Sequence, residues 1–157
     1  MDEQLYLLGM GLSLKEKVTK AIATLQHYEA EALKFSTDGY YLCDSFGKDS
    51  CVILDLAKRA GVKFIAHHNL TTIDPPELIW FGKKYHSATI IHKPEHSLFY
   101  RAAEIESVLP TRLERWCCKH YKENAGGWNK EIKLMGIRAQ ESGRRKALWK
   151  IWTPRLS

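Results

Sequence analysis

A short apolar run, a polar turn and an amphipathic helix follow one another between Tyr40 and Gly61, in the stretch YYLCDSFGKDSCVILDLAKRAG. The run YYLC predicts a buried strand, and helical spacing after Ser50 places four apolar side chains on one face, namely Val52, Ile53, Leu56 and Ala57. Gly61 predicts the end of this helix, because glycine readily adopts the left-handed conformation that closes a helix. A strand that leads directly into a helix favours a right-handed crossover and a parallel sheet.

The same alternation continues along the chain. Asp74 is predicted to cap a helix that has two prolines in its first turn and Glu77 three residues on. We therefore expect an α/β fold of the Rossmann-like kind, with a parallel sheet of about five strands flanked by helices on both faces, formed by residues 1–157 as a single domain. The other predicted elements are helices over 14–35, 50–60, 97–108 and 112–123, strands over 62–66, 88–91 and 132–137, and a last apolar run over 148–152.

Composition narrows the class of protein. With 45% hydrophobic and 27% charged residues, the 157-residue chain has the composition of a globular domain. No apolar run approaches the roughly 20 residues that cross a bilayer, so no membrane association is expected. The start, MDEQLYLLGM, is acidic and predicts no secretory signal, so a cytoplasmic location is expected. The net charge of +6 favours polyanionic partners such as nucleotides, and it allows nucleic acid without indicating it.

The turn SFGKDS, from Ser45 to Ser50, has the chemistry of a phosphate-binding loop. Backbone N–H groups and the helix dipole converge where a strand passes into a helix. Ser45 and Ser50 offer hydroxyls, Gly47 allows close approach of the backbone, Lys48 supplies charge, and Asp49 would hold the loop's own amides. A Walker loop is excluded because Asp49 separates Lys48 from Ser50, and a single glycine excludes a GxGxxG fingerprint. The alternative is a capped turn without a ligand.

This turn resembles the PP-motif, S-G-G-x-D-S, of the ATP pyrophosphatase superfamily, with Phe46 in place of one glycine. Within that superfamily the chain resembles the phosphoadenosine phosphosulfate (PAPS) reductase family over residues 40–148. The resemblance also rests on NLTTIDPPELIWF, which contains Thr71 and Thr72, and on RLERWCCKHYKE. A fourth stretch, GIRAQESGRR, matches the family's G-x-R-x-x-x-S-x-x-R pattern at four positions, namely Gly136, Arg138, Ser142 and Arg145.

The resemblance implies a nucleotide ligand, which would be ATP, PAPS or adenosine phosphosulfate (APS), with Mg²⁺ as an optional companion. Its nucleotide-binding residues would be the SFGKDS turn together with Thr71, Thr72, Arg138, Ser142 and Arg145. The implied reaction is the reductive release of sulfite from an adenylyl sulfate, with a thioredoxin-like thiol reductant as a partner and a homo-oligomer as a further option. Guanidinium groups suit phosphate or sulfate, although a solvated basic loop would also explain these arginines.

The cysteines depart from the family pattern. An iron–sulfur cluster needs four thiolates, and the pair Cys117-Cys118 is not followed by the family's later Cys-x-x-Cys, so no cluster is expected from this chain alone. Zinc bound by Cys117, Cys118 and His120 is a less favoured alternative, and no metal site is predicted. Cys43 and Cys51 are expected in the core, as reduced thiols. The histidines His67 and His68 are expected just after a strand, as polar boundary residues.

The family's catalytic cysteine, in a Glu-Cys-Gly-x-His segment near the C-terminus, is also absent from the sequence. Cys117 and Cys118 are the substitutes that remain, and catalysis by this chain therefore stays an open question. Two other functions are kept as alternatives. One is an ATP-dependent adenylyl or sulfur transferase that acts on tRNA or DNA, and the other is a catalytically silent nucleotide-binding subunit that works with a partner.

Overall fold

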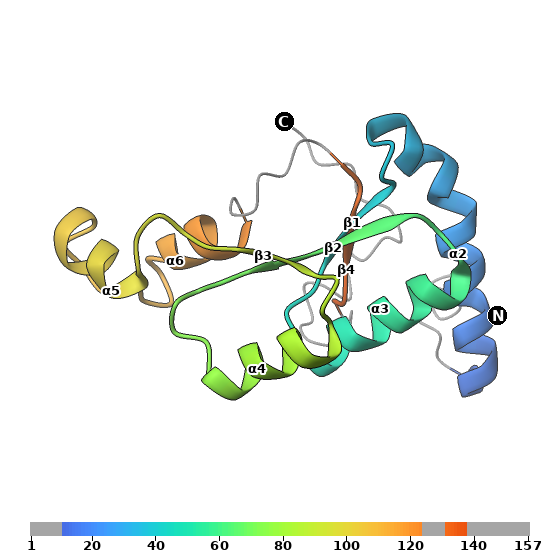
Figure 1. Cartoon of the computed structure of the whole chain (residues 1–157), viewed down its shortest axis with the longest axis horizontal. Helices are drawn as coiled ribbons and strands as arrows, with labels where there is room; N and C mark the ends of the chain where they lie inside the picture. The colour runs from blue at the N-terminus through green and yellow to red at the C-terminus, as the bar shows by residue number, and fades with distance from the viewer. Residues whose placement is uncertain (1–10, 124–130, 138–157) are drawn as a thin grey trace.

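The strand Tyr40–Cys43 (β1) lies inside a sheet in which every neighbouring pair of strands is parallel. The computed structural model describes residues 11–123 and 131–137, and over these residues the sheet has the order β3-β2-β1-β4 (Figure 1). Its other strands are β2 (Phe64–Asn69), β3 (Ile90–His92) and β4 (Lys133–Met135). The predicted α/β fold with a parallel sheet is confirmed. The apolar run 148–152 lies outside the described residues, as do Arg138, Ser142 and Arg145.

Three helices pack beside the sheet, namely α2 (Leu14–Phe35), α3 (Lys48–Ala60) and α4 (Pro76–Tyr85). A capping box starts α2, since the Ser13 hydroxyl accepts from the Glu16 amide at 3.3 Å and the Glu16 carboxylate accepts from the Ser13 amide at 2.8 Å. Gly61 ends α3 with a φ of 69°, as predicted. No helix in the described parts of the chain is both long and apolar enough to span a membrane.

The core lies where α2 and α3 meet the central strand. Tyr40 and Leu42 project from one face of β1 into a cluster of buried apolar residues from both helices. The Tyr40 hydroxyl donates a 2.7 Å hydrogen bond to the backbone carbonyl of Leu25, so the buried phenol finds a partner within α2. In the register of the sheet, Leu42 lies between Ala66 of β2 and Leu134 of β4. This packing fixes the direction in which β1 delivers the chain to α3.

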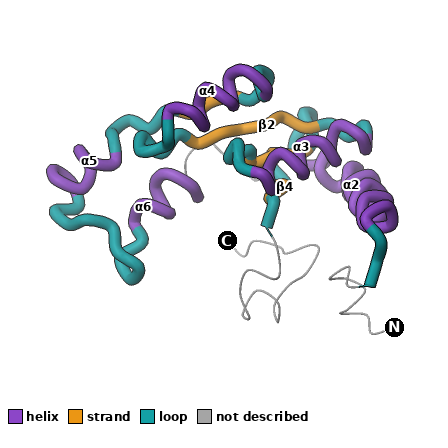
Figure 2. The backbone as a smooth tube through the Cα atoms, turned by 90° about the horizontal axis from the view of Figure 1, so that it is seen from below, coloured by secondary structure: helices purple, strands orange, loops and turns teal. Residues whose placement is uncertain are grey.

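Residues 98–123 contain short helical turns at the end of the molecule away from α2 (Figures 1 and 2). A turn of α-helix passes into a turn of π-helix twice: α5 (Leu98–Tyr100) into η1 (Arg101–Ile105), and α6 (Trp116–Cys118) into η2 (Lys119–Glu123). The side-chain amide of Asn69, at the end of β2, donates to the Lys122 carbonyl at 3.3 Å. This contact attaches η2 to the carboxyl edge of the sheet.

Several predicted boundaries were wrong. Strand β2 continues to Asn69, so His67 and His68 are strand residues rather than residues that follow a strand. Asp74 does not cap α4, because Pro75 precedes a second proline and is held in an extended conformation, which makes Pro75 the N-cap. The Asp74 carboxylate accepts instead from the Thr71 amide at 2.6 Å.

The expected faces and lengths of the helices also needed correction. Of the predicted core face of α3, Ala57 is buried and Ile53 and Leu56 pack against the core, whereas Val52 is 58% exposed. The two later helices are shorter than predicted. The helix predicted over 97–108 ends at Ile105, and the helix predicted over 112–123 starts at Trp116. Thr111 explains the late start, because its hydroxyl accepts from the amides of Leu113 and Glu114 and so holds a turn in place of a helix.

Candidate functional site at the carboxyl end of the central strand

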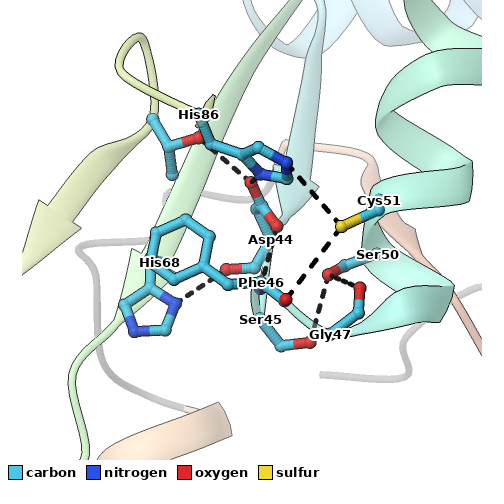
Figure 3. Close-up of polar contacts among 9 residues, drawn as sticks. Asp44, Ser45, Phe46, Gly47, Ser50, Cys51, His68 and His86 are labelled. Atoms are coloured by element: carbon cyan, nitrogen blue, oxygen red, sulfur yellow. Dashed lines mark hydrogen bonds and ion pairs between the residues drawn. The ribbon is translucent and has the colours of Figure 1, made fainter. Parts of the chain in front are cut away.

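The loop between β1 and α3, residues 44–47, lies at the carboxyl edge of the parallel sheet, where open α/β sheets bind their ligands (Figure 3). Strand β1 lies between β2 and β4 and is parallel to both, so the carboxyl ends of these two strands lie beside this loop. The first turn of α3 continues the sequence motif with Lys48, Asp49 and Ser50. The sheet therefore places the SFGKDS turn where the resemblance requires it.

Asp44 anchors the loop from beneath, and sequence reasoning missed it. Its carboxylate is fully enclosed, and it accepts hydrogen bonds from the Phe46 amide at 3.0 Å, from the Thr89 hydroxyl at 3.1 Å and from Nδ1 of His86 at 2.6 Å. These donors come from the loop itself and from the connection between α4 and β3. An acid at the end of an apolar strand was the available signal, since a buried carboxylate needs several donors. Asp44 thus holds an amide of the loop, that of Phe46, in addition to the two donors from the α4–β3 connection.

The Phe46 side chain packs between β2 and α4 and does not face a ligand. Its side chain is only 4% exposed, and its ring stacks on that of His68 with centroids 4.0 Å apart. On its far side α4 approaches so closely that a Cβ on Gly82 would come within 2.3 Å of the ring. The backbone of Phe46 has a φ of 60°, a conformation that glycine adopts freely and other residues adopt at a cost. Glycine would relax the backbone at this position, whereas phenylalanine places a packed ring between β2 and α4.

The polar groups of the turn form a short chain of hydrogen bonds. The Ser45 hydroxyl donates to that of Ser50 at 3.2 Å, and the Ser50 hydroxyl donates to the Gly47 carbonyl at 2.9 Å. Gly47 is the N-cap of α3, and no side chain of the described residues caps the helix there. The first amides of an α-helix have no acceptor within the helix. The start of α3 therefore presents donors, a positive dipole end and the exposed side chain of Lys48 to an anion.

The end of β4 packs directly against this helix start. A Cβ on Gly136 would come within 2.7 Å of the backbone carbonyl oxygen of Asp49 and within 3.2 Å of the Ser50 nitrogen. Only a glycine fits such an approach of two backbones. The beginning of GIRAQESGRR is thereby placed beside the turn, two residues before Arg138 in the sequence.

Thr71 and Thr72 follow β2 at the same edge of the sheet, but their hydrogen bonds organise the next segment. The Thr71 amide bonds to Asp74 at 2.6 Å, and the Thr72 hydroxyl accepts from the Leu98 amide at 2.9 Å. Thr72 also has a φ of 68°. These contacts join the β2–α4 connection to the start of α5, and they do not link either threonine to the SFGKDS turn.

The Cys117-Cys118 pair lies in α6, and its two thiols differ. The Arg115 guanidinium donates to the Cys118 sulfur at 3.3 Å and lowers the pKa of the Cys118 thiol, whereas burial raises the pKa of the Cys117 thiol. His120, the third residue of the alternative zinc site, is hydrogen-bonded by Arg101 at 3.1 Å. Among the described residues, no group of three or more histidine, cysteine, aspartate or glutamate side chains is arranged to hold a metal ion.

Comparison with known families supports this assignment of the motifs. The family model of the phosphoadenosine phosphosulfate reductase domain matches residues 40–155, which include the β1–α3 loop, the cysteine pair and the segment after β4. The chain belongs to this family. No curated protein and no solved structure matched the chain. The resemblance to the PAPS reductase family is thus confirmed, and with it a PP-loop protein that uses an adenine nucleotide.

Proposed function

We propose that the start of α3 and the β1–α3 loop bind the phosphates of an adenine nucleotide, and that the ligand is an adenylyl sulfate from which sulfite is released. The observation that carries the proposal is the open space at Gly47. An added Cβ there would meet only the Ser45 hydroxyl, at 3.4 Å, so the uncapped helix start faces a region that the described fold does not fill. Membership of the PAPS reductase family supports the choice of nucleotide.

The proposed ligands of the phosphates and sulfate are the backbone around Gly47, the Lys48 ammonium and the hydroxyls of Ser45 and Ser50. Arg138 and Arg145 would add guanidinium groups, and Mg²⁺ would offset the charge of a triphosphate. Gly136 supports this arrangement because it brings the segment that leads to Arg138 against the first turn of α3. The two arginines should therefore contribute to affinity and to its dependence on salt.

Titration of the purified chain with ATP, PAPS and APS by calorimetry tests the proposal. Gly47→Val is the informative variant, because its φ of −82° suits any residue and the added Cβ meets no backbone atom. The fold should survive, which circular dichroism would verify, while the side chain occupies the space the phosphate needs. We expect affinity to fall at least about tenfold. Equal affinity in a folded Gly47→Val protein would contradict the proposal.

The chemical step needs a thiol. A thiolate would attack the sulfonate sulfur, the bond from sulfur to the phosphate oxygen would break, and a nucleoside phosphate and an S-sulfocysteine would form; a dithiol reductant of the thioredoxin type would then release sulfite and become a disulfide. Cys118 is the better candidate of the pair because Arg115 stabilises its thiolate. A sulfite assay on the wild type and on the Cys117→Ser/Cys118→Ser protein decides whether the nucleophile belongs to this pair.

The net charge of +6 favours one second candidate, an ATP-dependent adenylyl or sulfur transferase that acts on tRNA or DNA. The same titration separates the two functions. Tighter binding of PAPS or APS than of ATP supports the reductase reaction, whereas a preference for ATP together with a mobility shift of tRNA or DNA supports the transferase. Nucleotide binding without sulfite release or a shift would indicate a subunit that works with a partner.

A further inference from the structure

A cysteine, a histidine and an aspartate are joined by successive contacts beside the β1–α3 loop, with the histidine in the middle (Figure 3). The sulfur of Cys51, in the first turns of α3, lies 3.7 Å from Nε2 of His86 and 4.0 Å from the backbone carbonyl oxygen of Phe46. The other ring nitrogen of His86, Nδ1, lies 2.6 Å from the Asp44 carboxylate. The three residues come from three segments of the chain, the end of β1, the first turns of α3 and the residue that follows α4.

The hydrogen bonds assign the tautomer of His86. An ionised carboxylate can only accept, so Nδ1 of His86 carries a hydrogen and donates the hydrogen bond to Asp44. In the neutral imidazole Nε2 then has a free lone pair, and that lone pair faces the Cys51 sulfur. The Thr89 hydroxyl and the Phe46 amide hold the carboxylate in place from other directions. Cys51, His86 and Asp44 are therefore arranged as a nucleophile, a base and a group that orients the base.

The three side chains differ in their exposure to solvent. The side chains of Asp44 and His86 are 0% and 8% exposed, while Cys51 is half-buried. Burial and the negative charge of Asp44 raise the pKa of the Cys51 thiol. A raised pKa reduces the fraction of reactive thiolate, and a base that accepts the proton during the attack offsets this loss; His86 is placed to do so.

We propose that Cys51 is a thiol-modification site that reacts with small disulfides and soft electrophiles, with His86 as its base and Asp44 as the residue that positions His86. With a disulfide RSSR, the Cys51 sulfur attacks one sulfur, the S–S bond breaks and RS⁻ leaves. The thiol proton passes to Nε2 of His86 and then to the leaving thiolate. The products are the mixed disulfide on Cys51 and one RSH, so the small disulfide is the oxidant and is itself reduced.

The position of the sulfur gives this modification a consequence for the loop. The Cys51 amide donates to the Gly47 carbonyl at 3.0 Å, and the sulfur lies against the carbonyl of Phe46 and the ring of His86. A group attached to the sulfur adds bulk beside these neighbours. An adduct should therefore distort the helix start and weaken nucleotide binding. This second part rests on the proposed function, whereas the reactivity of Cys51 does not.

The experiment measures modification rates at each cysteine of the intact chain. The protein is treated with iodoacetamide or glutathione disulfide, and the labelled peptides are quantified by mass spectrometry over time. Cys43 is a reference within the same protein, because burial also raises the pKa of its thiol, but it is enclosed more deeply than Cys51, so the effect of His86→Gln on Cys51 is the decisive comparison. We expect Cys51 to react at least about tenfold faster than Cys43, and His86→Gln to slow Cys51 at least about tenfold while Cys43 is unchanged.

The contrary outcomes are separate from those of the proposed function. A Cys51 rate no higher than that of Cys43 in the wild type contradicts the proposal without any variant. An unchanged or faster Cys51 rate in a folded His86→Gln protein would show that His86 merely shields the sulfur. If His86→Gln does not fold, the wild-type ratio decides. If the chain binds none of ATP, PAPS and APS, the proposed function fails while the rates still test Cys51.

Discussion

Nδ1 of His86 and Oδ2 of Asp44 are 2.6 Å apart, in a contact that leaves the carboxylate no exposed surface. His86 is the residue that follows α4, and Asp44 is the residue at which the loop after β1 begins. The pair thus joins a helix end to a candidate binding loop through a single buried interaction. The surrounding fold therefore holds the loop in place, and substitutions at Asp44 or His86 should alter the conformation of the loop.

Removal of this carboxylate should be costly. Asp44→Ala leaves three buried donors without their acceptor, so we expect the free energy of unfolding to fall by about 3–5 kcal/mol in urea titrations. Asp55→Ala is the control, since Asp55 pairs with Arg59 at 3.5 Å on the exposed side of α3. That pair should contribute less than about 1 kcal/mol. A loss at Asp44 no larger than at Asp55 would show that the buried network contributes little.

At position 46 two small residues should reverse their usual order of stability. Both Phe46→Ala and Phe46→Gly lose the ring that packs against His68 and Gly82, but only glycine is relaxed at a φ of 60°. We expect the glycine variant to be more stable than the alanine variant by about 1 kcal/mol. Ala57→Gly, within α3, should instead lose about that amount. Thermal unfolding measures both comparisons, and an alanine variant as stable as the glycine variant would argue against the left-handed conformation.

The two ends of α3 offer a matched pair of lysines for testing anion binding. Lys48 opens the helix beside the candidate site, and Lys58 lies in its last turn. Lys48→Ala should weaken nucleotide binding by about tenfold to a hundredfold, because a charge-assisted contact is worth about 1.5–3 kcal/mol. Lys58→Ala removes the same charge and should leave affinity within about twofold. Calorimetry at fixed salt compares them, and equal losses would reveal a general charge effect rather than a local contact.

Two histidines on neighbouring strands should make stability depend on pH. Nδ1 of His67 lies 2.8 Å from Nε2 of His92, and burial lowers the pKa of both rings. Histidines in the unfolded chain bind protons below about pH 6.5, whereas these two bind protons in the folded protein only at a lower pH. A fall in pH therefore stabilises the unfolded state relative to the folded state. The midpoint of thermal unfolding should therefore decrease between pH 7.5 and pH 5.

His92→Gln removes one ring of this pair and should reduce that decrease by at least about 2 °C. His27→Gln, on an exposed residue of α2, is the control and should leave the decrease unchanged. A decrease of the same size in the His92→Gln protein would place the pH dependence elsewhere in the molecule.

The sequence predicted the parts of the fold that local chemistry determines. The apolar strand, the glycine that ends α3 and the alternation of strands with helices follow from periodicity and from the conformational freedom of glycine, and the structure confirms them. Interactions between distant residues were out of reach. The sequence around Asp44 does not indicate that His86 and Thr89 are its hydrogen-bond partners. Phe46 could be read from the sequence only as a substitution within a motif, and the structure shows that its ring packs against His68 and Gly82.

The contact of Gly136 with Asp49 has a consequence for how the protein is made. The two residues are separated by more than half the chain, yet a Cβ on the later one would touch the backbone of the earlier one. On a ribosome, the start of α3 emerges long before β4 does, and closing so long a loop is an unfavourable step that comes late in folding. The nucleotide site should thus mature only after β4 has docked. Nucleotide capture by a growing chain would then report the completion of the sheet.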